Sequence, residues 1–261
     1  MTSAALGPDR FEIGRVFNST FAVITRNIGL CFGLALLFSG LPTFLFQLWN
    51  EARLSKLTGG DPSNLALADP SLAIRDSLLT IVITLLYFIF SLLLQAALVR
   101  ATIEDLNGKK PDLGDSVQIA IRCLLPTIGI GLLVGLGAGA ASLALLVPGI
   151  VLWLGWSVSV PVLVQERLGV FGSMSRSRAL TKGNRWQLFG LYVIIFILAM
   201  VIQGVMGTAV YLVGGIIGSL LGAVVSAVMA TIMSTATAVS YVELRQVREG
   251  TSVGELAQIF S

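Results

Sequence analysis

The stretch Gly214–Val242 has the sequence GGIIGSLLGAVVSAVMATIMSTATAVSYV and contains no Asp, Glu, Lys or Arg. A helix rises about 1.5 Å per residue, so roughly twenty apolar residues cross a hydrocarbon core of about 30 Å. This stretch is longer than that minimum. It therefore predicts a transmembrane helix.

Five further stretches of the chain also contain no Asp, Glu, Lys or Arg. Across the protein, 55% of residues are hydrophobic and 12% are charged, whereas soluble domains carry about 25% charged residues. We predict an all-α polytopic membrane protein with six transmembrane helices, built as a single integral membrane domain over residues 1–261. The other predicted spans are about Ile28–Leu48, Ser77–Val99, Leu124–Val147, Gly149–Val164 and Trp186–Met206.

The basic residues give these spans an orientation. If the N-terminus is placed inside, all but Arg53, Lys56 and Arg75 of the 17 Lys and Arg residues fall in cytoplasmic segments. Cytoplasmic connectors of membrane proteins carry such an excess. We predict a multi-pass protein of the bacterial inner (plasma) membrane with both termini in the cytoplasm. Basic connectors suit an anionic lipid surface, and no basic patch interleaved with aromatics indicates a nucleic-acid partner.

The absence of histidine restricts the chemistry open to this chain. Histidine is the commonest general base and the commonest transition-metal ligand, and the six stretches also lack carboxylates and lysines. The two cysteines, Cys31 and Cys123, are expected to be free thiols at the cytoplasmic ends of their spans. We therefore expect a protein that is not an enzyme and that holds no cofactor and no metal.

Three segments on the predicted cytoplasmic side have the pattern of interfacial amphipathic helices, at about residues 9–26, 112–123 and 169–183. Asp112 or Asp115 can cap the second, and Arg178 interrupts the apolar stripe of the third. Each segment precedes two spans, which indicates a helix-plus-hairpin unit repeated three times, either as a pseudo-threefold bundle or as a sequential stack. Internal repeats in membrane proteins often surround a central site. The alternative is that these helices only anchor connectors at the interface.

Small residues recur at every fourth position of the sixth stretch. Small side chains let helix backbones approach closely. A step of four residues drifts about 40° around the helix, because 3.6 residues make a turn. The row is thus expected to meet several partner helices, or one at a steep crossing, either within the chain or in a homo-oligomer. The row begins Gly214, Gly218, Gly222 and Ser226, and the third stretch has a comparable row in Gly131, Gly135 and Gly139.

Polar side chains at membrane depth leave two interpretations open. Hydroxyl groups in helices can bond to the carbonyl of the preceding turn or to a neighbouring helix. They can also line a polar cavity. The residues concerned are Gln95, Gln203, Thr231, Ser234 and Thr235.

Four basic residues lie within ten positions of one cytoplasmic connector. Such a cluster can hold anionic lipid head groups or a phosphorylated ligand, with Ser177 and Thr181 as additional donors. The alternative is that the cluster only sets topology. The residues are Arg176, Arg178, Lys182 and Arg185.

The segment PVLVQERLGVFGSMSRSRALTKGNRWQLFG, Pro161–Gly190, resembles the membrane domain associated with bacterial glycerophosphodiester phosphodiesterases and a related stand-alone inner-membrane family. The connector RATIEDLNGKKPDLGDS, Arg100–Ser116, is similar to the second connector of that family. Arg178 departs from the resemblance, since the family more often has an aromatic residue there. The matching residues are Pro161, Val164, Glu166, Gly169, Arg176, Ser177, Leu180, Thr181, Gly183 and Trp186.

The resemblance implies little about activity. Phosphodiesterase activity in that family belongs to a separate soluble catalytic domain that relies on histidines and a carboxylate-held metal, and this chain has no histidine. We expect a non-enzymatic protein that organises or regulates the membrane through contacts with anionic lipids, a protein partner or another copy of itself. The alternative is a transporter or channel-like component for a small or lipid-like amphiphilic molecule, which a cavity lined by Gln95, Gln203 and the hydroxyls would favour.

Overall fold

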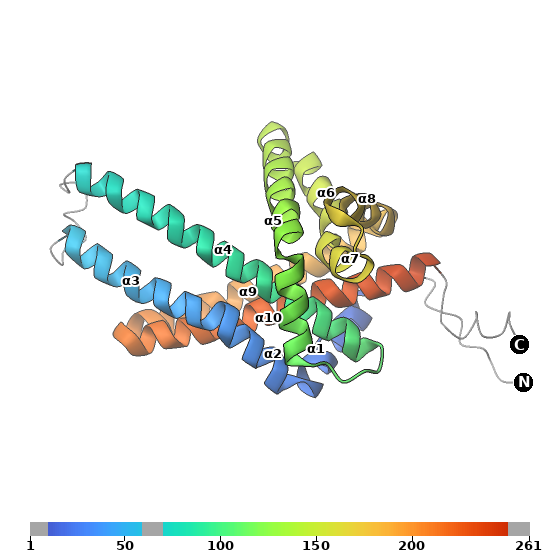
Figure 1. Ribbon diagram of the computed structural model, residues 1–261, viewed down its shortest axis with the longest axis horizontal. Coiled ribbons are helices and arrows are strands. Elements are labelled where there is room, and N and C mark those ends of the chain that lie inside the picture. The colour runs from blue at the N-terminus through green and yellow to red at the C-terminus, as the bar shows by residue number, and fades with distance from the viewer. Residues whose placement is uncertain (1–9, 59–69, 250–261) are drawn as a thin grey trace, which may run out of the picture.

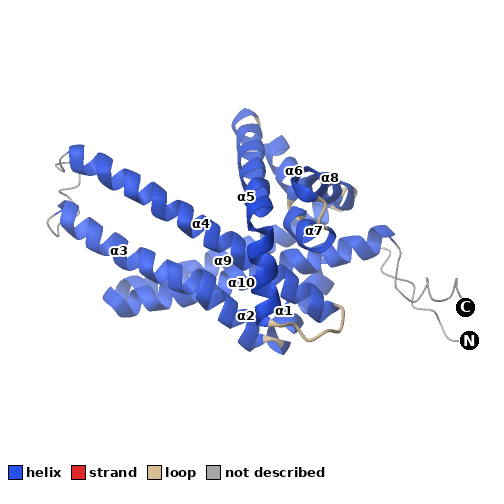
Figure 2. Cartoon of the chain, viewed as in Figure 1, coloured by secondary structure: helices blue, strands red, loops and turns tan. Residues whose placement is uncertain are grey.

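The computed structural model describes residues 10–58 and 70–249, and every regular element within them is a helix (Figure 2). Six segments are long and apolar enough to cross a membrane, and each overlaps one predicted stretch. The all-helical, multi-pass character expected from the sequence is therefore confirmed at this level. The segments are Ile28–Arg53, Ser77–Leu106, Leu113–Ser142, Val147–Glu166, Arg185–Val210 and Gly215–Glu249.

The first span is not a uniform α-helix. It consists of α2 (Ile28–Ala35), a π-helical segment η1 (Leu36–Gly40) and α3 (Leu41–Thr58). A π turn inserts an extra residue into the helix and is frequent at functional sites. Here it places Ser39 and Gly40 in the buried interior, against α10 (Gly215–Glu249).

Four long helices flank this interior. Helices α3, α4 (Pro70–Leu106), α9 (Arg185–Val213) and α10 extend toward the same end of the molecule, at the left of Figure 1. Gly214 and Gly215 join α9 to α10 with φ angles of 62° and 55°. Side chains with a Cβ rarely adopt this conformation, so the tight turn depends on the glycines.

The third and fourth spans form a separate hairpin. Helix α5 (Leu113–Ala144) and α6 (Leu146–Trp156) are joined by the single extended residue Leu145. In Figure 1 this hairpin rises steeply away from the line of α3, α4, α9 and α10. The predicted fourth span, 149–164, is divided between α6 and α7 (Ser159–Glu166). The six apolar segments therefore do not form one bundle of parallel helices.

The predicted interfacial segments have different outcomes. The first and third correspond to separate helices, α1 (Ile13–Arg26) and α8 (Gly169–Thr181), while residue 9 lies outside the described residues. Segment 112–123 is not a separate helix, because α5 continues through it and through Pro126 without interruption. Asp112 does cap this helix, accepting a 2.9 Å hydrogen bond from the Asp115 N–H. The threefold repeat stays a prediction.

The core lies where α2, α4 and α10 meet. Its largest fully buried side chains include Leu34, Leu98 and Tyr241. Helix α1 packs on α10, and Arg15 Nε lies 2.6 Å from Glu243 Oε1. At the end of α1, Arg26 donates a 2.5 Å hydrogen bond to Asp105. This bond and the carboxylate charge raise the pKa of Arg26 above its ordinary value.

Candidate functional site

The break between α6 and α7 organises the first candidate site. Ser157 and Val158 interrupt the helix, and the carbonyl oxygen of Gly155 accepts hydrogen bonds from the hydroxyls of α8. Ser177 Oγ donates at 2.8 Å and Thr181 Oγ1 at 3.5 Å. Both hydroxyl residues are fully buried. Helix α8 is thus fixed on the broken span by polar contacts.

Two arginines flank the same glycine. A Cβ atom placed on Gly155 would lie 3.5 Å from Arg178 Cγ and 3.6 Å from Arg185 Nη2. The Arg178 guanidinium carbon lies 4.7 Å from the centre of the Trp156 ring, within the range of a cation–π contact. Among the described residues, no hydrogen-bond partner exists for the buried Arg185 Nε. Two positive charges therefore lie beside the break.

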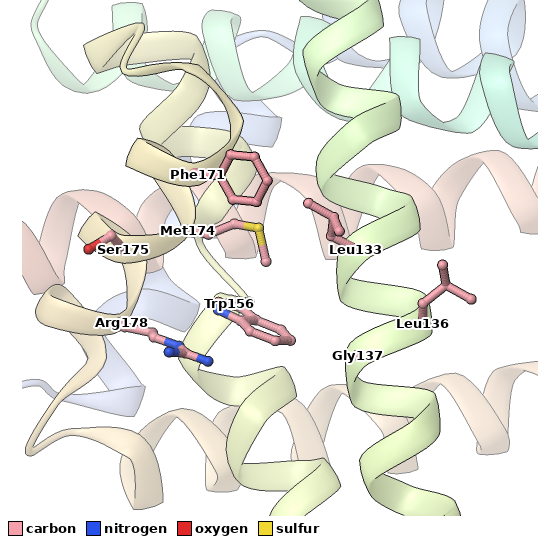
Figure 3. A pocket seen from close by; sticks show the side chains of 8 residues that line it. All are labelled: Leu133, Leu136, Gly137, Trp156, Phe171, Met174, Ser175 and Arg178. Carbon is pink, nitrogen blue, oxygen red and sulfur yellow. The ribbon is translucent and has the colours of Figure 1, made fainter.

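A groove of about 460 Å³ opens next to these charges, between α5, α6 and α8. Figure 3 shows Phe171, Met174 and Trp156 facing Leu133 across the groove, with Arg178 at one edge. Arg178 is the sole charged residue of the described lining, so the groove is apolar with one cationic edge. The groove, which we call the α5–α8 groove, is lined by Leu133, Leu136, Gly137, Trp156, Phe171, Met174, Ser175 and Arg178.

Large apolar side chains at the groove are open to the surroundings. Phe171 is 77% exposed and Leu136 is 70% exposed. On the far wall, a Cβ on Gly137 would lie 2.9 Å from the Trp156 ring, closer than carbon atoms normally approach. The glycine therefore sets how near α5 comes to α6, and with it the width of the groove.

The predicted basic cluster does not come together as one site. Arg176 forms ion pairs with Glu166, at 3.1 Å, and with Glu249, so its charge is neutralised. Lys182 has an exposed side chain, and its carbonyl accepts a hydrogen bond from Arg248. Residues two apart on a helix point to different faces. For this reason Arg178 reaches the groove and Arg176 does not, which sequence proximity could not reveal.

Part of the predicted polar set lines a second cavity, of about 240 Å³, between η1, α4 and α10. Gln95 and Ser234 belong to its lining. Gln203 is exposed on α9 and is not part of it. Thr231 and Thr235 are buried outside the cavity, and Thr231 donates to the Ala227 carbonyl at 2.8 Å. The lining residues missed by sequence reasoning are Ser39, Tyr87, Ser91 and Ser226 together with apolar Phe38, Leu94, Ala230 and Met233.

The small residues of α10 contact different helices in succession. A Cβ on Gly218 would lie 2.8 Å from the Val210 carbonyl oxygen of α9. One turn later, a Cβ on Gly222 would lie 2.9 Å from Gln47 Nε2 of α3. Ser226 then faces the second cavity, whereas Gly214 belongs to the turn. This succession follows the angular drift of a row spaced by four residues.

The small residues of α5 do not meet those of α10. A Cβ on Gly131 would lie 3.0 Å from Phe88 Cζ of α4, while Gly135 and Gly139 face open space. Helix α5 instead packs against α4, α6, α7 and α8. The two rows are therefore not a matched pair of packing surfaces.

Across residues 10–58 and 70–249, no group of three or more Cys, Asp and Glu side chains is placed to hold an ion. Cys31 and Cys123 are free thiols, and they belong to α2 and α5.

Comparison of the chain with protein-family models, with curated proteins and with solved structures gives no match. The resemblance of Pro161–Gly190 to the membrane domain associated with glycerophosphodiester phosphodiesterases therefore rests on the sequence motif and stays a prediction.

Proposed function

We propose that this protein binds an anionic, lipid-like amphiphile in the α5–α8 groove and organises or regulates the membrane through that contact, without chemistry of its own. The observation that carries the proposal is the groove itself, whose walls are apolar and whose edge carries Arg178. An amphiphile has the complementary arrangement, with an apolar chain and a charged head.

The cationic edge suits an anionic head group. An arginine presents several N–H donors in one plane and can bind two oxygens of a phosphate or carboxylate at once. The Trp156 ring holds the Arg178 guanidinium at 4.7 Å, which restricts its orientation before any ligand arrives. Arg185 lies beside the same Gly155 and adds positive potential. Such a site favours a head group with a net negative charge over a zwitterionic head group.

The walls suit an acyl chain. Leu136 and Phe171 are mostly exposed apolar side chains, which are compatible with the acyl chain of a lipid. An amphiphile therefore matches both parts of the groove, with its chain along the apolar walls and its head group at Arg178.

The test is retention of a defined lipid, measured by native mass spectrometry of the full-length protein titrated in mild detergent. Phosphatidylglycerol is the anionic probe and phosphatidylcholine is the zwitterionic control. We expect phosphatidylglycerol to remain bound to the wild type and to be largely lost from Arg178→Ala. The matched variant Lys182→Ala removes one exposed positive charge near the end of α8 and should retain the lipid. Equal retention by both variants, or no preference for the anionic lipid, would overturn the proposal.

A second function, movement of a small molecule through the protein, has a separate observation in its favour. Gln95 and Ser234 line a polar cavity between α4 and α10, and none of the described lining residues is charged. Such a cavity is compatible with uncharged cargo rather than ions.

A further inference from the structure

The 240 Å³ cavity between η1, α4 and α10, here called the polar chamber, lies within the membrane-spanning part of the fold. Hydroxyl and amide groups from three elements converge on it, although none is charged. A buried polar surface is costly unless its groups find partners. The polar residues of its lining are Ser39, Tyr87, Ser91, Gln95, Ser226 and Ser234.

The hydroxyls of the polar chamber differ from others in the same helices. Thr237 and Ser240 of α10 donate to the carbonyl four residues earlier, at 2.8 and 2.7 Å, which is the usual arrangement in membrane helices. Ser39 and Ser234 are only 5% and 8% exposed. In the described part of the chain, neither hydroxyl has a hydrogen-bond partner, and the Gln95 amide has none either. Their hydrogen-bonding capacity is available to a bound molecule.

The π turn is the reason that Ser39 reaches the polar chamber. Phe38 and Ser39 belong to η1, where the extra residue changes the direction in which side chains leave the helix. Without that insertion the following residues would present a different face to α10. The irregular segment therefore supplies one wall of the polar chamber.

Two further cavities lie next to one another between the polar chamber and the Gly214 end of the molecule. A cavity of about 380 Å³ shares Tyr87 with it, and a third of about 210 Å³ shares Gln47 with the second. Thr43 donates a 3.4 Å hydrogen bond to Tyr87 where the first two meet. The third cavity is lined by Asn50, Glu51 and the Gly214 turn. This succession follows α3, α4 and α10 toward the end of the bundle at Gly214.

The opposite direction is closed. Beyond Gln95 and Ser234, toward the Glu249 end of α10, the next turns carry Leu98, Ala238 and Tyr241, which are 0%, 0% and 1% exposed. The polar chamber thus ends in the packed core on this side, whereas Tyr87, Ser91 and Met233 of its lining are exposed. A chamber closed on the Glu249 side is a binding site rather than an open pore.

We propose that the polar chamber binds a small uncharged solute rich in hydroxyl groups. Hydroxyl and amide groups each donate and accept hydrogen bonds, which matches a polyol. None of the described residues that line the polar chamber is charged, so an ion would lose its hydration without compensation. This inference is independent of the lipid site at α8, because the two sites share no residue.

The experiment uses full-length protein in which Cys31 and Cys123 are replaced by alanine and Ser234 by cysteine. The thiol at position 234 is reacted with a small neutral methanethiosulfonate, with and without glycerol as the probe. We expect reaction in the absence of glycerol and a several-fold slower reaction in its presence. The control is Thr237→Cys in the same background, since Thr237 is buried on α10 outside the polar chamber and should react much more slowly.

Two outcomes overturn the inference. One is a Ser234→Cys reaction no faster than that of Thr237→Cys, which would show that the polar chamber is closed to solutes. The other is a rapid reaction that glycerol does not slow. Adding Gln95→Met to Ser234→Cys gives a further check, because loss of the amide should remove most of the glycerol protection while labelling continues. Monodisperse elution in detergent establishes that each variant is folded before its rate is compared.

Discussion

At the scale of single residues, the closest contacts of this protein depend on glycines and hydroxyls. Gly155 brings its carbonyl within 2.8 Å of Ser177 Oγ, and Gly137 lets α5 approach the Trp156 ring. Membrane helices gain little from apolar contact alone, because lipid is as apolar as leucine. Close packing and hydrogen bonds therefore decide which helices associate, and two substitutions at this scale can be predicted.

Gly137→Ala should destabilise the protein and weaken lipid retention. The new Cβ would lie 2.9 Å from the Trp156 ring, and such overpacking costs about 1–3 kcal/mol, which exceeds the helix-propensity gain of about 1 kcal/mol. Gly135→Ala is the control, since that position faces open space and should be neutral or stabilising. Thermal unfolding in detergent and phosphatidylglycerol retention measure the two effects. A Gly137→Ala variant as stable as Gly135→Ala would contradict this account.

Ser177→Ala should lower stability by about 1 kcal/mol, the typical net value of one hydrogen bond. It removes the 2.8 Å bond to the Gly155 carbonyl from a fully buried position. Ser175→Ala, two residues earlier at an exposed position of α8, should leave stability unchanged. The midpoint of thermal unfolding distinguishes them, and equal midpoints would mean that the bond does not hold α8 in place.

At the scale of elements, charged side chains join helices that are far apart in the chain. Glu166, at the end of α7, accepts hydrogen bonds from Arg176 of α8 and, at 2.9 Å, from the Tyr241 hydroxyl of α10. Arg176 also pairs with Glu249, which Arg245 contacts at 2.8 Å. Helices α7, α8 and α10 are thus joined by one network. Connected charges contribute more than isolated surface pairs.

Arg176→Met should lower stability by about 1–2 kcal/mol, because it leaves two partly buried carboxylates without their main partner. Methionine retains most of the side-chain volume, so the loss reports on charge rather than packing. Lys182→Met is the control at an exposed position of the same connector. Thermal unfolding at low and high salt measures both, and we expect the difference between the variants to shrink as salt screens the network. No difference at low salt would show that the network is dispensable.

At the scale of the whole molecule, the hairpin of α5 and α6 has its own direction. Its tip at Leu145 points away from the end of the bundle where α3 finishes at Thr58 and α4 begins at Pro70. Length and composition make both hairpin segments candidates for spanning, yet length alone does not fix tilt. A hairpin of two helices returns the chain to the side on which it began. The predicted cytoplasmic location of both termini is therefore the same whether or not α5 and α6 cross the membrane.

Cysteine labelling of intact cells tests this arrangement in a background with Cys31 and Cys123 replaced by alanine. Lys56→Cys lies on the predicted outer segment and should react with a membrane-impermeant maleimide. Leu145→Cys should not react from outside, because Leu145 and its neighbour Val147 are apolar side chains, each 69% exposed, that favour a position in the lipid. Reaction of Leu145→Cys at the rate of Lys56→Cys would instead show that the hairpin crosses the membrane.

The sequence by itself determined the helical class, the approximate positions of the six apolar segments and the presence of a helix cap at Asp112 or Asp115. These properties follow from local composition, because a lipid environment requires long apolar segments whose backbone groups bond internally. Tertiary structure alone decided that α5 continues through 112–123. It also decided that Arg178 contacts Trp156, whereas Arg176 pairs with Glu166 and Glu249. Likewise, only the packed structure brings Gln95, Ser39 and Ser234 to one cavity. In membrane helices the lipid-facing and buried faces are both apolar. Periodicity therefore carries little information about which faces meet, and those contacts depend on packing between distant segments.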